Sequence, residues 1–222
     1  MPLEDKIEFV RNSEPRCPVV LLLDSSASME GDRISQLNAG VMTFKQEVER
    51  DPTASLRVEV AIISFSNSVS IIQDFITIDD FIPTQLSAKG LTAMGQAIEV
   101  ALDMLEERRA IYRDNGIASY QPWVILITDG EPTDSWKSAA IRVRQAIADR
   151  KVNFYVIGVQ DANMNILREI ASPNVPPVML QGLKFQELFK WVSASLRRVS
   201  SSKVGGGQVE LPPINGWAQT NT

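Results

Sequence analysis

The sequence predicts an α/β fold: a doubly wound, mostly parallel six-stranded sheet with one antiparallel edge strand and helices on both faces. Two observations lead to this prediction. Short apolar runs alternate along the chain with longer stretches in which apolar residues recur every three or four positions. The runs are typical of strands buried on both faces, and the periodic stretches are typical of the crossover helices that join parallel strands. A length of 222 residues, with 44% hydrophobic and 22% charged residues, agrees with a globular domain of this kind.

The first half of the chain begins with a predicted strand at 18–24, and an amphipathic helix follows at 34–50. Two β-rich runs come next, at 57–65 and 68–75. The gap between them is long enough for a hairpin and for no longer connection. One edge strand of the sheet is therefore expected to be antiparallel.

The second half of the chain continues the alternation of helix and strand. Its expected elements, in order, are a helix at 94–109, a buried strand at 123–128, a helix at 135–150, a strand at 152–159, a short helix at 163–171, a short edge strand at 177–180 and a closing helix at 185–199. This alternation argues for one doubly wound domain.

The domain organisation follows from changes in composition. We expect an N-terminal extension over residues 1–15, a single α/β domain over 16–199, and a Ser/Gly-rich linker with a C-terminal arm over 200–222. The linker is a run of serines followed by a run of glycines, as in flexible linkers. The arm carries Trp217, which would be a liability if exposed, so the arm is expected to pack back on the domain. The alternative is a peptide that another protein binds.

The composition also excludes several classes of function. The chain contains no histidine, which excludes histidine triads, histidine-bound zinc and imidazole acid–base catalysis. The single cysteine, Cys17, excludes internal disulfides and is typical of a reducing compartment. A net charge of −5 argues against nucleic acid as a partner. We recognise no signal peptide and no membrane-spanning run, so we expect a cytoplasmic protein without a membrane partner.

Polar side chains follow two of the buried strands and precede one helix. Asp24, Ser26 and Ser28 come after the first strand, Asp129 comes after a later buried strand, and Thr92 lies just before a helix. In an open parallel sheet such positions meet at the carboxyl edge, where ligands bind. Two carboxylates and three hydroxyls are hard oxygen ligands that suit Mg²⁺, with Mn²⁺ and Ca²⁺ as alternatives. Each piece alone is also a common cap or turn pattern, but together they predict a metal site.

This combination resembles the metal-ion-dependent adhesion site of von Willebrand factor A (VWA) domains, which have a Rossmann-like fold. The Asp-x-Ser-x-Ser loop, the distant threonine and the Thr-Asp-Gly after a buried strand carry the resemblance, which covers nearly all of the predicted folded part. It implies that Ser26, Ser28 and Thr92 contact the metal directly. It also implies that Asp24 and Asp129 act directly or through water.

The segments CPVVLLLD and ITDGEPTDSW, and the small stand-alone size, further resemble the bacterial TerY-like group linked with tellurite resistance. That resemblance implies a role in a bacterial stress or metal-resistance system, beside kinase-like or phosphatase-like proteins. One departure from the family pattern is Ala27, which stands where many members have glycine. An alanine is harmless there only if the backbone does not need a positive φ.

Four further residues are candidates for a rim on which a partner would bind: Met29, Met94, Glu131 and Asp134. The two methionines flank residues of the metal loops and are equally consistent with a place in the core. The two acidic residues would select partners by charge. The segment around them also reads as a turn that leads into a helix, and this structural interpretation is favoured.

The favoured functional hypothesis is a non-enzymatic protein-interaction module, in which the ion accepts an Asp or Glu carboxylate from a protein partner. One alternative is a metal-dependent phosphohydrolase that uses Asp24 as its nucleophile. Against it, Ser26 stands where the haloacid-dehalogenase loop has a second carboxylate, and no glycine-rich phosphate loop follows the first strand. The other alternative is a scaffold whose metal site is vestigial.

Overall fold

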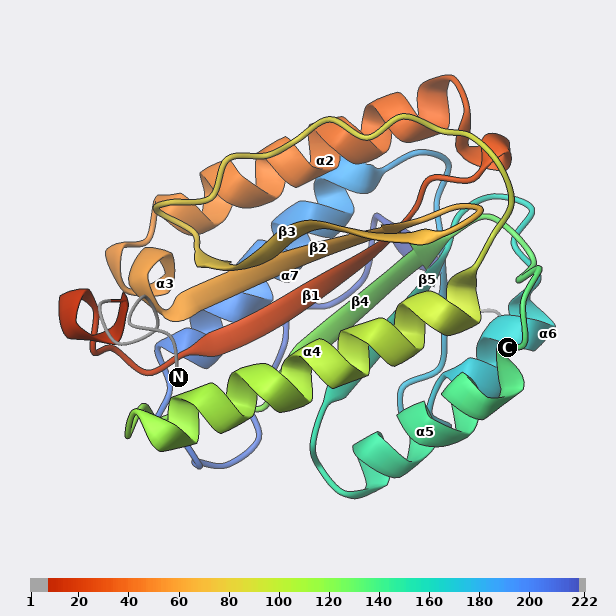
Figure 1. Ribbon diagram of the computed structural model, residues 1–222. Coiled ribbons are helices and arrows are strands. Elements are labelled where there is room, and N and C mark those ends of the chain that lie inside the picture. The colour runs from red at the N-terminus through yellow and green to blue at the C-terminus, as the bar shows by residue number, and fades with distance from the viewer. Residues whose placement is uncertain (1–7, 220–222) are drawn as a thin grey trace.

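A sheet of seven strands in the order β3-β2-β1-β4-β5-β6-β7 forms the centre of the described chain (Figure 1). The computed structural model describes residues 8–219; residues 1–7 of the expected N-terminal extension and 220–222 of the arm lie outside them. The strands are β1 (Cys17–Asp24), β2 (Val58–Phe65), β3 (Val69–Thr77), β4 (Trp123–Thr128), β5 (Asn153–Gly158), β6 (Val178–Leu180) and β7 (Ala218–Gln219).

Helices cover both faces of this sheet, which confirms the predicted doubly wound α/β architecture (Figure 1). Two long helices, α2 and α7, pack together on one face, and α4, α5 and α6 cover the other. The helices are a 3₁₀ turn η1 (Ala27–Met29), α2 (Asp32–Glu49), α3 (Pro52–Arg57), α4 (Met94–Asp114), α5 (Lys137–Ala148), α6 (Met164–Ile170) and α7 (Phe185–Ser200).

Three features differ from the sequence-based expectation. The short helix α3 lies between the helix predicted at 34–50 and the strand predicted at 57–65, where no element was predicted, and Asp51 caps it by accepting hydrogen bonds from the amides of Thr53 and Ala54. The C-terminal arm adds β7 as a seventh strand, antiparallel to β6, so both edges of the sheet are antiparallel. Helix α4 continues to Asp114 instead of ending at Arg109. Short capped helices and strands made by an arm have no long apolar period, which is why the pattern missed them.

The central strands are parallel and buried throughout. Strand β1 lies between β2 and β4, with Leu23 opposite both Ser64 and Ile127. Its side chains alternate between the two layers: Leu21 packs toward α2 and α7, and Leu22 toward α4 and α5. Because β1 and β4 are parallel neighbours in this register, the loops that follow Asp24 and Thr128 leave the sheet side by side, at the carboxyl ends of the strands.

The C-terminal arm packs against α7 and the edge of the sheet. Trp217 is 4% exposed, and its ring centroid lies 5.3 Å from that of Trp191. The indole nitrogen of Trp191 donates a hydrogen bond of 2.7 Å to the carbonyl of Pro212. The arm therefore covers α7 and ends in the β-pairing with β6.

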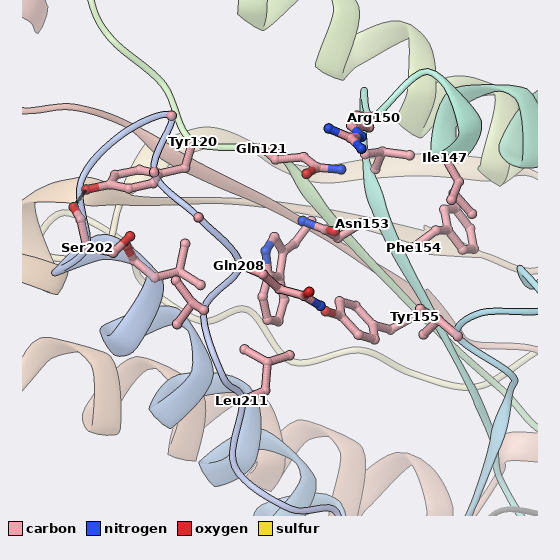
Figure 2. Close-up of a pocket in the computed structure, with 18 of the residues that line it drawn as sticks. Tyr120, Gln121, Ile147, Arg150, Asn153, Phe154, Tyr155, Ser202, Gln208 and Leu211 are labelled. Atoms are coloured by element: carbon pink, nitrogen blue, oxygen red, sulfur yellow. Dashed lines mark hydrogen bonds between the residues drawn. The ribbon is translucent and has the colours of Figure 1, made fainter.

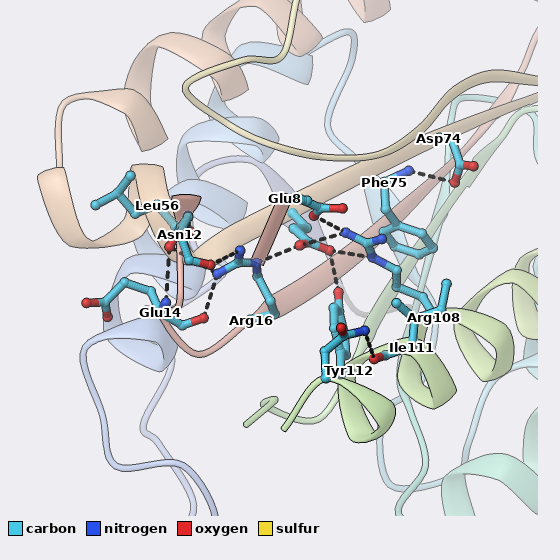
Figure 3. Close-up of polar contacts among 12 residues, drawn as sticks. Glu8, Asn12, Glu14, Arg16, Leu56, Asp74, Phe75, Arg108, Ile111 and Tyr112 are labelled. Carbon is cyan, nitrogen blue, oxygen red and sulfur yellow. Dashed lines mark hydrogen bonds and ion pairs between the residues drawn. The ribbon is translucent and has the colours of Figure 1, made fainter. Parts of the chain in front are cut away.

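A buried ion-pair network ties β2 and the residue before β1 to α4 at the amino-terminal ends of these strands (Figure 3). Glu59, which is fully buried, accepts a hydrogen bond of 2.7 Å from Nε of Arg16 and one of 2.9 Å from Nε of Arg108. Nη2 of Arg108 donates another at 2.9 Å, and the hydroxyl of Tyr112 donates as well. Glu8 binds Arg108 from the chain before β1. One carboxylate thus neutralises two buried guanidinium groups, with help from Glu8.

Candidate metal centre

Asp24 ends β1 and has no exposed surface. Its Oδ1 accepts a hydrogen bond of 2.8 Å from the amide of Ser26, and its Oδ2 accepts one of 2.5 Å from the hydroxyl of Thr128. Burial raises the pKa of Asp24 to about 6, although the hydrogen bonds from Ser26 and Thr128 oppose the rise. The negative charge of Asp129 raises it further. Two carboxyl groups are therefore held close together in a low-dielectric site.

A chain of hydrogen bonds joins the loop after β1, which is the first loop of the site, to the loop after β4, which is the third; the second is the loop before α4. The hydroxyl oxygens of Ser26 and Ser28 are 2.9 Å apart, and the Ser28 hydroxyl donates a hydrogen bond of 2.6 Å to Oδ1 of Asp129. Ser26 and Asp129 are buried, whereas Ser28 is exposed. The three side chains thus face one another, and the site opens to solvent at Ser28.

Thr92 reaches the same place from the loop before α4. A Cβ built on Gly130 would lie 3.1 Å from Oγ1 of Thr92 and 3.7 Å from Oδ2 of Asp24, so the hydroxyl and the Asp24 carboxylate both lie beside this glycine. Within the described part of the chain, no hydrogen bond engages Oγ1 of Thr92. The backbone of Thr92 is fixed by its carbonyl, which accepts a hydrogen bond of 2.9 Å from the amide of Thr133.

Backbone hydrogen bonds hold the first two loops together. The amide of Ala27 donates to the carbonyl of Gly90 at 3.0 Å, and the amide of Lys89 donates to the carbonyl of Ser25 at 2.8 Å. Gly90 has a φ of +78°, and a Cβ there would come within 2.6 Å of the Asn67 side chain. Glycine is therefore required at this crossing.

Ala27 lies in the 3₁₀ turn η1 and is not among the described residues with a positive φ. An alanine at position 27 is therefore unstrained, and its presence in place of the family's glycine does not distort the loop. The positive φ that follows the loop, +80°, falls on Gly31, which precedes α2.

Arg33 is a member of the site that the sequence analysis missed. It lies in the first turn of α2, and its guanidinium makes an ion pair with Oδ2 of Asp129. Its remaining nitrogens bind Oε1 of Gln160 and Oδ2 of Asp161, each at 3.0 Å. The hydrogen bond to Asp129 raises the pKa of Arg33, which therefore stays charged. Arg33 lies just before the helix predicted at 34–50, and a single arginine at such a position carries no signal of this contact.

The structure contradicts the predicted rim position of two of the four residues and gives a third a helix-capping role. Met29 and Met94 have no exposed surface, because both side chains point into the apolar core. Asp134 caps α4: its carboxylate accepts hydrogen bonds of 3.0 and 2.8 Å from the amides of Gly95 and Gln96. Glu131 is exposed and accepts a hydrogen bond of 2.5 Å from Asn163. Of the four, only Glu131 remains a candidate for contact with a partner.

The chemistry of this donor set suits a hard divalent cation. Two carboxylates and three hydroxyls converge from three loops, and all are oxygen ligands. Among residues 8–219, no three Asp, Glu, Cys or His side chains group in a way that could hold a metal, so the hydroxyls are essential to this site. The unengaged Thr92 hydroxyl and the solvent opening at Ser28 leave room for further ligands.

The chain also has a cavity of about 660 Å³ at the opposite end of the strands (Figure 2). Tyr155 and Asn153 of β5 line it, together with Tyr120 and with Gln208 from the linker after α7. The cavity is remote from Asp24 and shares none of its residues.

Comparisons with known proteins point in one direction. A family model described as the von Willebrand factor type A domain matches residues 19–190. Among curated proteins, the collagen alpha-4(VI) chain of Mus musculus is 28% identical over 167 residues. That match covers 72% of this chain but 7% of the collagen chain, so this chain spans a small part of its relative.

Solved structures share the fold at low sequence identity. The pilus adhesin SpaC from Lactobacillus rhamnosus GG, in its open conformation, has a TM-score of 0.66 and 15% identity, over 84% of this chain and 31% of that one. The protein BatB from Bacteroides thetaiotaomicron has a TM-score of 0.56 and 20% identity, over 84% of this chain and 100% of that one. Proximal thread matrix protein 1 from the mussel byssus, with a zinc-occupied adhesion-site motif, has a TM-score of 0.56 and 18% identity, over 84% of this chain and 49% of that one.

Proposed function

The chain belongs to the von Willebrand factor type A domain family, and from this premise we propose that it is a non-enzymatic, divalent-metal-dependent protein-interaction module. Domains of this family generally act as interaction modules. The single observation that carries the proposal is the convergence of five oxygen-bearing side chains, from three separate loops, beyond the carboxyl ends of β1 and β4: Asp24, Ser26, Ser28, Thr92 and Asp129.

These five residues would hold the ion, and their chemistry favours Mg²⁺ over softer metals. Mn²⁺ and Ca²⁺ are alternatives, and the zinc in the mussel byssus protein supports a divalent cation in general. When bound, the ion would act as an electrostatic anchor for an Asp or Glu carboxylate of a protein partner. The chain's own part is to hold the ligands on rigid strand ends and to leave one side open at Ser28.

The geometry gives no support to Asp24 as the nucleophile of a phosphohydrolase. Its side chain is fully buried, and both carboxylate oxygens already accept hydrogen bonds, from Ser26 and from Thr128. A nucleophile must reach the substrate, and these contacts hold the carboxylate away from solvent. The same contacts support a role for Asp24 as a fixed anchor of the metal loops.

A bacterial stress or tellurite-resistance role, as in the TerY-like group, is part of the proposal. So is a kinase-like or phosphatase-like protein as the partner. A cytoplasmic location also stays a prediction, supported by the single buried Cys17. In the described part of the chain, no helix is long and apolar enough to cross a bilayer.

Thermal unfolding of metal-stripped protein tests the proposal. An ion at ten times its Kd stabilises the folded state by about 1.4 kcal/mol, which raises Tm by roughly 3–6 °C for a chain of this length. Thr92→Val keeps the shape of the side chain and removes the hydroxyl, so we expect the ion-dependent shift to disappear. Thr84→Val, at an exposed position in the same connection, is the matched control and should keep it. An unchanged Tm with every ion at millimolar concentration contradicts the proposal.

A further inference from the structure

Arg33 places a fixed positive charge on one of the two site carboxylates. Its Nη1 makes an ion pair with Oδ2 of Asp129 and lies 3.3 Å from the carbonyl oxygen of Ser28. The side chain is 22% exposed, and its Nε and Nη2 each donate a hydrogen bond of 3.0 Å, to Gln160 and Asp161 respectively. All three guanidinium nitrogens are therefore engaged, and the charge is fixed at the site.

Asp129 consequently has a donor on each of its carboxylate oxygens. The hydroxyl of Ser28 binds Oδ1 at 2.6 Å, and Arg33 binds Oδ2. A hydroxyl that donates to Asp129 can rotate and offer its lone pairs to a cation instead. A guanidinium has no lone pairs to offer and repels any second cation that shares its carboxylate.

We infer that Arg33 is a resident cation that competes with the divalent ion for Asp129, so that the free protein binds the ion weakly and a partner's carboxylate makes ion and partner bind cooperatively. This inference rests on the proposed function. The ion alone would neutralise the charge of about −2 on the two site carboxylates. The other counter-charge of Arg33, Asp161, is 88% exposed and screened by solvent, so Arg33 leaves the buried part of the loaded site with excess positive charge. An arriving carboxylate supplies the missing negative charge.

The same contacts connect the site to the loop after β5. Gln160 and Asp161, which bind Arg33, lie two and three residues after the end of that strand. Gln160 has a φ of +26°, which is unusual for a residue other than glycine, and its side chain accepts a hydrogen bond from Nε of Arg33. When the ion weakens the ion pair between Arg33 and Asp129, this loop loses part of its support.

Ion affinity, measured by isothermal titration with Mg²⁺ and Mn²⁺, tests the inference. Arg33→Gln removes the charge while keeping a hydrogen-bonding side chain, and we expect it to tighten ion binding by about tenfold. Arg142→Gln is the matched control: it removes the same charge from an arginine that binds Glu99 and Asp103 on α4, away from the site. It should leave the affinity unchanged.

A second measurement separates competition from simple stabilisation of the loop. In wild type, adding Mg²⁺ should speed amide hydrogen exchange at residues 158–163, and in Arg33→Gln it should not. An affinity in Arg33→Gln that is equal to or weaker than wild type overturns the inference while leaving the proposed function intact. If neither protein binds either ion at millimolar concentration, the proposed function fails, and the inference fails with it.

Discussion

The hydroxyl of Ser28 donates a hydrogen bond of 2.6 Å to the carboxylate of Asp129, although 101 residues separate them in the chain. The contact exists because β1 and β4 are parallel neighbours whose carboxyl ends face the same side. The loop after each strand then delivers its side chain to the shared edge. The site is thus a consequence of the sheet topology.

Gly130→Ala should weaken ion binding by about tenfold, a loss of the size seen when residues that support metal ligands are changed. The added methyl group would lie 3.1 Å from Oγ1 of Thr92, so the threonine must shift by a few tenths of an ångström. Gly207→Ala is the control, because nothing lies within 4 Å of a Cβ there and its φ is not positive. Titration calorimetry of both variants measures the effect. Equal affinities would show that Thr92 does not need its present position.

Asp134→Ala should lower the free energy of unfolding by about 1 kcal/mol, the usual value of a lost helix cap. Its carboxylate accepts hydrogen bonds from the amides of Gly95 and Gln96 at the start of α4. Ion affinity should stay within about twofold of wild type, since Asp134 bonds to none of the five ligands. Urea unfolding and titration calorimetry check the two parts. A large loss of partner or ion binding at unchanged stability would instead assign Asp134 to the rim.

Glu59→Gln should lower the free energy of unfolding by about 3–5 kcal/mol, because it leaves two buried guanidinium groups without their shared counter-charge. Arg16 and Arg108 both bind Glu59, and Tyr112 donates to it (Figure 3). Glu107→Gln, at an exposed position of α4, is the matched control and should cost little. Urea denaturation measures both. A cost below 1 kcal/mol for Glu59→Gln would mean that Glu8 and water replace the lost charge.

The thiol of Cys17 should be unreactive in the folded protein. Burial raises its pKa from 9.0 to about 12, so the reactive thiolate is absent at neutral pH. The sign of the linkage follows: the folded state holds this proton more tightly than the unfolded chain. Stability is therefore fully present below pH 9 and is lost as the pH rises toward 12. Alkylation at pH 8, with and without urea, measures the protection. Equal rates in both would contradict burial of Cys17.

The sequence was sufficient to predict the parts of this protein that have a regular pattern. Apolar runs and helical periods located the central strands and the long helices, and the Asp-x-Ser-x-Ser loop and its distant partners identified the side chains that meet. Arg33 could not be found in this way, because its contacts with Asp129 and Gln160 depend on the angle at which α2 leaves the site. Met29 and Met94 were equally compatible with core and rim, since periodicity does not tell which side of a loop a side chain faces.

The most direct test of the account is a titration of Mn²⁺ into metal-stripped protein, followed by the electron paramagnetic resonance signal of the free ion. Wild type should remove one Mn²⁺ per chain from solution, and excess Mg²⁺ should release it. Thr92→Val and Asp129→Asn should bind none at the same concentrations, whereas Thr84→Val should behave as wild type. A free-ion signal that is unaffected by wild-type protein at millimolar concentration, or removed equally well by Asp129→Asn, would contradict a metal site built from these loops.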